Sequence, residues 1–219
     1  MNRDEIEFTT VLENNTPRYG VRLAAETRER LRQYYAHVSA GNARLHLVAP
    51  CSPAEFAARH ILESLVALRF ITAGAHIIDV GSGAGLPIIP CLIAHPDLRA
   101  TLIEASAKKA IFLRDTLRRL NLQDAAQVVT ARFAETLTPA ADYVTCRALE
   151  RFTERLPSLV DWSPPSSTLL FFGGPSLREK IEGLSLSYHA QLMPESTQRF
   201  LFVVNRTGNS HRHSGEQAA

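Results

Sequence analysis

The chain has 219 residues, of which 45% are apolar and 21% are charged. This composition is close to the average of globular proteins and excludes a disordered or fibrous chain. Lys and Arg number 24 against 22 Asp and Glu, and the resulting net charge of +2 neither indicates nor excludes a nucleic-acid-binding protein. We expect one domain of ordinary size, with or without an extension.

The cysteines argue against disulfides and zinc. Cys51, Cys91 and Cys146 stand far apart and form no Cys-x-x-Cys motif, which fits a reducing compartment. Residues 1–10 are polar and charged and lack the apolar core of a signal peptide. No run of residues approaches the roughly 18 apolar residues of a membrane span. We expect a soluble, cytoplasmic monomer without a membrane segment or a metal site.

Residues 1–72 are predicted to be helical. One helix is predicted over residues 26–38, where Leu31, Tyr34, Tyr35 and Val38 share a face. The Gly-Asn pair at 41–42 is expected to end it. A second helix begins at Ser52, because residues 52–55 form a capping box with proline at the first helical position. This helix is expected to continue to about residue 68.

From residue 76 onward, predicted strands alternate with helices. The predicted strands cover residues 77–80, 101–104, 127–129, 142–145 and 168–172, followed by two closing strands at 188–192 and 200–204. The intervening helices are predicted over residues 87–94, 108–120 and 152–159. This alternation predicts an α/β fold with a parallel sheet, right-handed crossovers and helices on both faces. Residues 207–219 are polar and are expected to form a disordered tail.

Ligands of such sheets bind at the carboxyl ends of the strands. A Gly-x-Gly-x-Gly loop, residues 81–85, follows the first strand, and glycines there allow a ligand to approach the backbone. Leu86 stands where a dinucleotide fingerprint has its third glycine, which disfavours a pyrophosphate-binding enzyme. By itself, the loop is also compatible with a turn that binds nothing.

Acidic residues follow the next two predicted strands. Glu104 ends the second strand, where a carboxylate can accept both hydroxyl groups of a ribose. The alternative is an exposed acidic residue that stabilises the start of the following helix. The glycine loop makes the ribose interpretation the stronger one. Ala134 and Glu135 follow the third strand, where an adenine edge would lie, although Glu135 alone is typical of a surface residue.

These elements resemble the S-adenosylmethionine-dependent methyltransferases, whose first motif is an acidic residue followed by Gly-x-Gly-x-Gly. Four segments narrow the resemblance to the small-subunit (16S) ribosomal RNA methyltransferase G family, also called glucose-inhibited division protein B. They are residues 59–64, residues 78–87, Lys108 with Phe112-Leu113, and Arg147-Ala148. The similarity extends over residues 42–206 in the order of the family.

The resemblance implies a seven-stranded, mostly parallel, Rossmann-like methyltransferase sheet over residues 73–206 with an N-terminal helical extension over residues 1–72. It implies S-adenosylmethionine as the cofactor, and 16S ribosomal RNA or the small ribosomal subunit as the partner. The implied reaction is methylation of guanine N7. This nitrogen has a free lone pair and no proton, so we predict no catalytic general base.

Site residues follow from the motifs and from the resemblance. The expected cofactor-binding residues are Gly81, Ser82, Gly83, Gly85, Leu86, Glu104, Ala105, Phe133, Ala134, Glu135 and Arg147. The expected substrate-binding residues are Arg59, His60, Ser64 and Lys108. Arg147 is expected to position the cofactor or the substrate, the alternative being an ion pair with Asp142 or Glu150. A core histidine is the alternative for His60, and a solvated helix face is the alternative for Lys108.

The sequence departs from the family pattern at three positions. Ile88 stands where the family usually has glycine, Gly173 where it has lysine, and His46 where it has asparagine. Two other functions therefore stay open. One is a methyltransferase that acts on a small molecule or a protein, and the other is a ribosome-associated protein that binds S-adenosylmethionine without catalysis.

Overall fold

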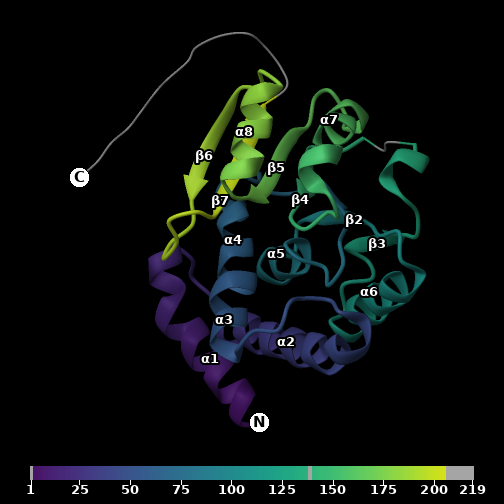
Figure 1. Cartoon of the computed structure of the whole chain (residues 1–219). Coiled ribbons are helices and arrows are strands. Elements are labelled where there is room, and N and C mark those ends of the chain that lie inside the picture. The colour runs from purple at the N-terminus through teal and green to yellow at the C-terminus, as the bar shows by residue number, and fades with distance from the viewer. Residues whose placement is uncertain (1, 138–139, 206–219) are drawn as a thin grey trace.

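The computed structural model describes residues 2–137 and 140–205, so the predicted tail at 207–219 lies outside the described residues. Figure 1 shows a twisted sheet with helices on both faces. The helices are α1 Arg3–Asn15, α2 Ala25–Leu45, α3 Pro53–Glu55, α4 Glu63–Val66, α5 Ile88–Ala94, α6 Ala107–Arg119, α7 Phe152–Trp162 and α8 Pro175–Gly183. The strands are β1 His76–Val80, β2 Arg99–Ile103, β3 Ala126–Val129, β4 Tyr143–Cys146, β5 Thr168–Gly173, β6 Tyr188–Leu192 and β7 Phe200–Asn205.

The strands form one sheet in the order β3-β2-β1-β4-β5-β7-β6, which has seven strands within the described residues. The pairs among β1 to β5 are parallel, whereas β7 pairs antiparallel with both β5 and β6. The predicted seven-stranded, mostly parallel sheet is confirmed. The strand order reverses between β1 and β4, the position at which open α/β sheets bind ligands.

Two hydrophobic clusters cover the two faces of the sheet. Ile77 points to the face covered by the N-terminal helices, α5 and α6, and its neighbour Ile78 points to the face covered by α7 and α8. This alternation is the period of two expected of a strand. Because the N-terminal helices share a core with one face of the sheet, they are held rigidly beside the strand ends.

The predicted end, at residues 41–42, of the helix that includes residues 26–38 is wrong. Helix α2 continues through Gly41 to Leu45. A Cβ at Gly41 would lie 3.0 Å from the ring of Phe112, so this glycine lets α2 pack closely against α6. Asn42 is not a helix breaker either, because its Oδ1 accepts hydrogen bonds from the backbone N–H groups of Leu47 and Val48. It thereby folds the segment that follows α2.

The capping box at Ser52 is confirmed, since both of its reciprocal hydrogen bonds are present. The helix does not continue as a regular α-helix, however. Residues Phe56–Leu62 form a π-helical segment, η2, in which the N–H of Glu63 donates to the carbonyl of Ala58, five residues earlier. Such segments are rare and are frequent at functional sites. The predictions also missed α8, which begins at Pro175 and buries Leu177 and Ile181.

Candidate functional site

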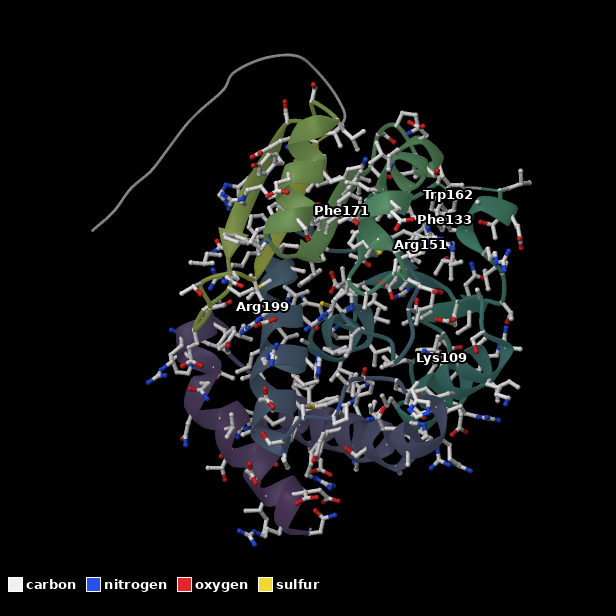
Figure 2. The ribbon with its side chains drawn as sticks, viewed as in Figure 1. Lys109, Phe133, Arg151, Trp162, Phe171 and Arg199 are labelled. Atoms are coloured by element: carbon white, nitrogen blue, oxygen red, sulfur yellow. The ribbon has the colours of Figure 1, made fainter. Side chains whose placement is uncertain are left out.

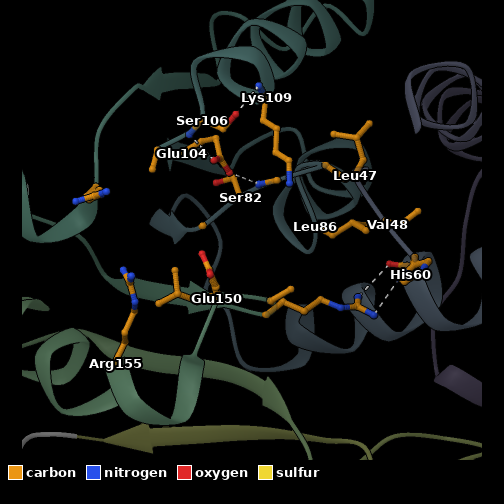
Figure 3. A pocket seen from close by; sticks show the side chains of 18 residues that line it. Leu47, Val48, His60, Ser82, Leu86, Glu104, Ser106, Lys109, Glu150 and Arg155 are labelled. Atoms are coloured by element: carbon orange, nitrogen blue, oxygen red, sulfur yellow. Dashed lines mark hydrogen bonds between the residues drawn. The ribbon is translucent and has the colours of Figure 1, made fainter. Parts of the chain in front are cut away.

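A pocket of about 470 Å³, the large pocket, opens at the carboxyl ends of β1, β2 and β4. Figure 3 shows Glu104 and Lys109 on one side, with Glu150 and Arg155 opposite. Leu47, Val48 and His60 close the end that the N-terminal extension contributes. The pocket therefore lies between the sheet and the extension, at the reversal of strand order.

The glycine loop lines the floor of the large pocket, and its glycines have different tasks. Gly81, Gly83 and Gly85 have φ angles of +72°, +55° and +94°, a region that favours glycine. A Cβ at Gly83 would meet nothing nearer than a carbonyl oxygen at 3.8 Å, so the space above it is open to a ligand. A Cβ at Gly85 would lie 2.2 Å from Cδ1 of Ile89. Gly85 therefore allows α5 to pack against the loop.

Glu104 ties the second strand end to the glycine loop. Its carboxylate accepts hydrogen bonds from the backbone N–H groups of Gly83 and Ser106, both at 2.8 Å. The residue is 8% exposed, so the alternative of an exposed helix-opening carboxylate is wrong. A carboxylate has about four lone-pair positions, and two remain to accept hydroxyl groups of a ribose.

Asp79, the last residue but one of β1, is buried directly before the loop. Its Oδ1 accepts a hydrogen bond from Thr145 Oγ1 at 2.7 Å, whereas Oδ2 has no partner in the part of the chain that the structure describes. Burial, with a smaller contribution from the nearby charge of Glu104, raises the pKa of Asp79 to about 7. An unsatisfied buried oxygen next to a ligand loop is the feature that a bound polar group would satisfy.

The N-terminal extension supports the loop from the other side. The Tyr34 hydroxyl, fully buried on α2, donates a hydrogen bond to the carbonyl of Ala84 at 3.0 Å. Asn42 holds Leu47 and Val48 in the pocket wall through the hydrogen bonds described above. The extension therefore shapes the pocket as well as covering one face of the sheet.

Arg147 follows β4 and joins it to the extension. Its guanidinium donates to Ser64 Oγ at 3.0 Å and to the carbonyls of Arg59 at 2.5 Å and His60 at 3.4 Å. Its Nη2 lies 3.6 Å from Oε2 of the buried Glu63. The alternative of an ion pair with Asp142 or Glu150 is wrong, since the partner carboxylate comes from α4.

His60 lines the large pocket beside Arg147, with its Nδ1 3.3 Å from the arginine Nη2. Its ring packs edge-on against Phe56. Burial, assisted by the charges of Arg147 and Arg59, lowers the pKa of His60 to about 3. The imidazole is therefore neutral at pH 7 and too weakly basic to serve as a general base there.

The structure places about half of the expected site residues in the wall of the large pocket. These are Gly81, Ser82, Gly83, Leu86, Glu104, Ala105, Arg147 and His60. The remainder lie outside it: Gly85, Phe133, Ala134, Glu135, Arg59, Ser64 and Lys108. Of these, Arg59 and Ser64 accept hydrogen bonds from Arg147, and Phe133 borders a small adjoining hollow. The ligand roles of these residues remain predictions.

Several pocket residues lie outside the expected set of site residues, and they include three cations and two apolar residues: Lys109, Arg132, Arg155, Leu47 and Val48. Lys109 lines the pocket while Lys108, its exposed neighbour, does not. Adjacent residues of a helix point in directions about 100° apart, so only one of the two lysines can face the pocket. The choice between them depends on which side of α6 is buried against the sheet.

Comparison with known proteins identifies the family of this chain. The model of the GidB family, described as rRNA small subunit methyltransferase G, matches residues 27–202. The chain belongs to this family. A ribosomal RNA small subunit methyltransferase G from Sorangium cellulosum is 37% identical over 170 residues, which cover 74% of this chain and 70% of that relative. One from Xanthomonas axonopodis pv. citri is 37% identical over 155 residues, covering 70% and 72%.

Solved structures agree on the fold. The ribosomal protein L11 methylase from Lactobacillus delbrueckii subsp. bulgaricus superposes with a TM-score of 0.55 at 13% identity, covering 68% of this chain and 79% of that one. As a member of the methyltransferase G family, the chain is an S-adenosylmethionine-dependent methyltransferase, as the sequence predicted. Over the described residues, every helix is too short or too polar to cross a membrane.

Proposed function

We propose that this enzyme transfers the methyl group of S-adenosylmethionine to N7 of a guanine in 16S ribosomal RNA. The large pocket carries the proposal: the glycine loop and Glu104 form one side, and segment 59–64 of the family motif closes the other around Arg147. Both parts come from motifs that match the methyltransferase G family.

The residues of the pocket fit the cofactor. Glu104 is available to the ribose hydroxyls, and the open space above Gly83 allows a ligand to contact the loop backbone. When bound, S-adenosylmethionine supplies a methyl group on a sulfonium. The nucleophile attacks the methyl carbon, and the sulfur leaves in line as a thioether. The task of the protein is then to align the acceptor and to match the changing charge.

Two ionisable groups of the pocket, His60 and Glu104, are poorly suited to deprotonate an acceptor. His60 is neutral and weakly basic, and the Glu104 carboxylate is engaged by two backbone N–H groups. Guanine N7 reacts through a lone pair and loses no proton. An acceptor such as a protein amine or hydroxyl would require a base.

Cations around the large pocket favour a polyanionic substrate. Lys109, Arg132 and Arg155 line it from three separate elements. Within the described residues, Lys109 and Arg155 have no ion-pair partner, and Arg132 lies 3.7 Å from Glu135. Arginine and lysine contacts to phosphates supply much of the affinity for RNA. We therefore infer an RNA acceptor rather than a small molecule.

The remaining expectations depend on this substrate. With a net charge of only +2, the enzyme is expected to need the folded surface of a small subunit for tight contact. We infer a cytoplasmic, monomeric enzyme, and a division into a helical extension over residues 1–72 and a methyltransferase domain over residues 73–206.

The test is methyl transfer from labelled S-adenosylmethionine to small subunits purified from a strain that lacks the gene. Chemical cleavage at 7-methylguanine then locates the label. We expect labelling of one guanine in 16S RNA. Label at another base or ring position, or cofactor binding without transfer, would contradict the proposal and favour one of the two other functions.

A further inference from the structure

A second cavity of about 230 Å³, the side hollow, lies at the carboxyl end of β5. Six side chains shape it: Glu63, Arg147, Phe172, Met193, Arg199 and Phe200. They come from α4, from the ends of β4, β5 and β7, and from the loop before β7. Figure 2 shows Arg199 beside α4, where it pairs with Glu63.

The side hollow and the large pocket meet at Arg147, which lines both. β4 and β5 are parallel neighbours, so their carboxyl ends bring the two cavities to the same edge of the sheet. A nucleophile must lie directly beside the methyl donor to react in line. A cavity that shares a side chain with the large pocket is therefore placed to hold the acceptor.

The polar groups of the side hollow match one edge of a guanine base. Glu63 is 2% exposed; its Oε1 accepts from Arg199 Nε at 2.7 Å, and its Oε2 lies 3.6 Å from Arg147 Nη2, beyond hydrogen-bond range. A carboxylate accepts from the N1–H and the N2 amino group of guanine, and a guanidinium donates to O6. Adenine has no N1–H, so it would leave the buried carboxylate poorly matched.

The other side of the hollow is apolar. Phe172 and Met193 are 5% and 1% exposed, and the guanidinium of Arg147 lies 5.6 Å from the ring centroid of Phe172, so the wall that a flat base would meet is fixed in place. The guanidinium of Arg178 lies 4.4 Å from the ring centroid of Phe200 and keeps that ring in place. Enzymes that modify a base commonly hold it, out of its stack, between apolar side chains and groups that read its Watson–Crick edge.

We propose that the side hollow binds the acceptor guanine after the base has left the RNA stack, and that Glu63 selects guanine by accepting from N1–H and the N2 amino group. The proposal rests on the proposed function, because it names the base site of the same reaction. It makes Glu63 and Arg199 specificity-determining residues.

The test measures nucleotide binding to protein saturated with S-adenosylhomocysteine, so that the large pocket is filled. GMP and AMP are titrated separately and followed by NMR. We expect GMP to bind about tenfold more tightly than AMP and to shift the ring signals of Phe172 and Phe200. Glu63→Gln should abolish the preference, whereas Glu179→Gln, on the exposed side of α8, should retain it.

Equal affinity of the wild type for GMP and AMP would overturn the proposal. So would a Glu63→Gln protein that loses methyl transfer but keeps the preference for GMP, because Glu63 would then only hold Arg147 in position. If Glu63→Gln does not fold, the proposal is tested by the wild type alone, through its preference for GMP over AMP and the shifts of the Phe172 and Phe200 ring signals. The proposed function fails separately, when the wild type forms no 7-methylguanine in small subunits.

Discussion

The two sides of the large pocket are built in different ways. The side formed by the glycine loop and Glu104 comes from two short segments at the ends of neighbouring strands. The Gly83 N–H donates to Glu104, and the Gly81 and Ser82 N–H groups donate to the carbonyl of Ile103. The opposite side comes from the segment after α2, from η2 and from the end of β4, which lie far apart in the sequence. Arg147 joins the end of β4 to η2 and α4 through hydrogen bonds to Ser64 and two backbone carbonyls.

The difference separates two tasks. The side formed by the glycine loop and Glu104, the local side, positions groups suited to a cofactor that the whole superfamily shares. The opposite side, which contains Arg147, is called the assembled side. The assembled side borders both the large pocket and the side hollow, and it is therefore suited to an acceptor that differs between families. Variants on the local side should mainly change cofactor affinity, and variants on the assembled side should mainly change turnover.

The largest effect is expected for Arg147→Ala. The change removes the guanidinium that lies 3.6 Å from Oε2 of buried Glu63, and with it the hydrogen bonds to Ser64 and to two backbone carbonyls. Because Glu63 keeps its closer ion pair with Arg199 at 2.7 Å, the loss of stability should stay below the about 3–5 kcal/mol of an uncompensated buried charge. Misplacement of the acceptor should lower turnover by about 100-fold or more. Thermal unfolding and single-turnover methyl transfer measure the two effects; full activity would disprove the role of Arg147.

Glu104→Ala tests the local side. Losing the hydrogen bonds of a buried carboxylate costs roughly 2–4 kcal/mol, so S-adenosylmethionine should bind about one to three decades more weakly. Calorimetry measures the dissociation constant, and Glu179→Ala, at an exposed position on α8, is the control. A change below about threefold would show that Glu104 only organises the loop.

The glycines of the loop should respond differently. Gly83→Val places a side chain in the open part of the large pocket and should weaken cofactor binding by about tenfold, or about 1.4 kcal/mol. Gly85→Ala instead pushes against Ile89 and should mainly lower stability, by about 1–3 kcal/mol. Calorimetry and thermal unfolding of both variants decide. Equal loss of affinity in two equally stable variants would contradict this division of tasks.

Asp79 predicts a pH effect in the ligand-free protein. Its pKa is about 7 when folded and about 4 when unfolded, so the folded state binds more protons between these values. Its contribution to the free energy of unfolding therefore falls as pH rises from about 4 to about 7. His60 acts oppositely, because its folded pKa is lowered to about 3. Asp79→Asn should thus gain stability relative to the wild type across this range, and a constant difference in urea unfolding would contradict the prediction.

The smallest effect is expected at Lys109. If Lys109 contacts one RNA phosphate, Lys109→Ala should reduce the slope of log affinity against log salt by about 0.7–0.9. Lys108→Ala, one residue away but outside the large pocket, should change the slope less. Binding of small subunits at several salt concentrations measures both slopes. An equal change in both variants would mean that the whole face of α6, not the pocket, meets RNA.

The sequence predicted the local side of the pocket better than the assembled side. The glycine loop and Glu104 stand next to apolar runs that mark strand ends, so their position follows from the strand pattern. The Glu63 partner of Arg147 could not be predicted, because it depends on how the π-helical segment and α4 pack against β4. Gly41 misled for a related reason: only the nearby ring of Phe112 shows that it serves helix packing.

The central claim is the methylation of a guanine N7 in 16S ribosomal RNA. The most direct test is mass spectrometry of nucleosides from the 16S RNA of cells with the gene, without it, and without it but complemented. We predict that one 7-methylguanosine disappears on deletion, and that the wild-type gene restores it while Arg147→Ala does not. An unchanged 7-methylguanosine content in the deletion strain would contradict the account.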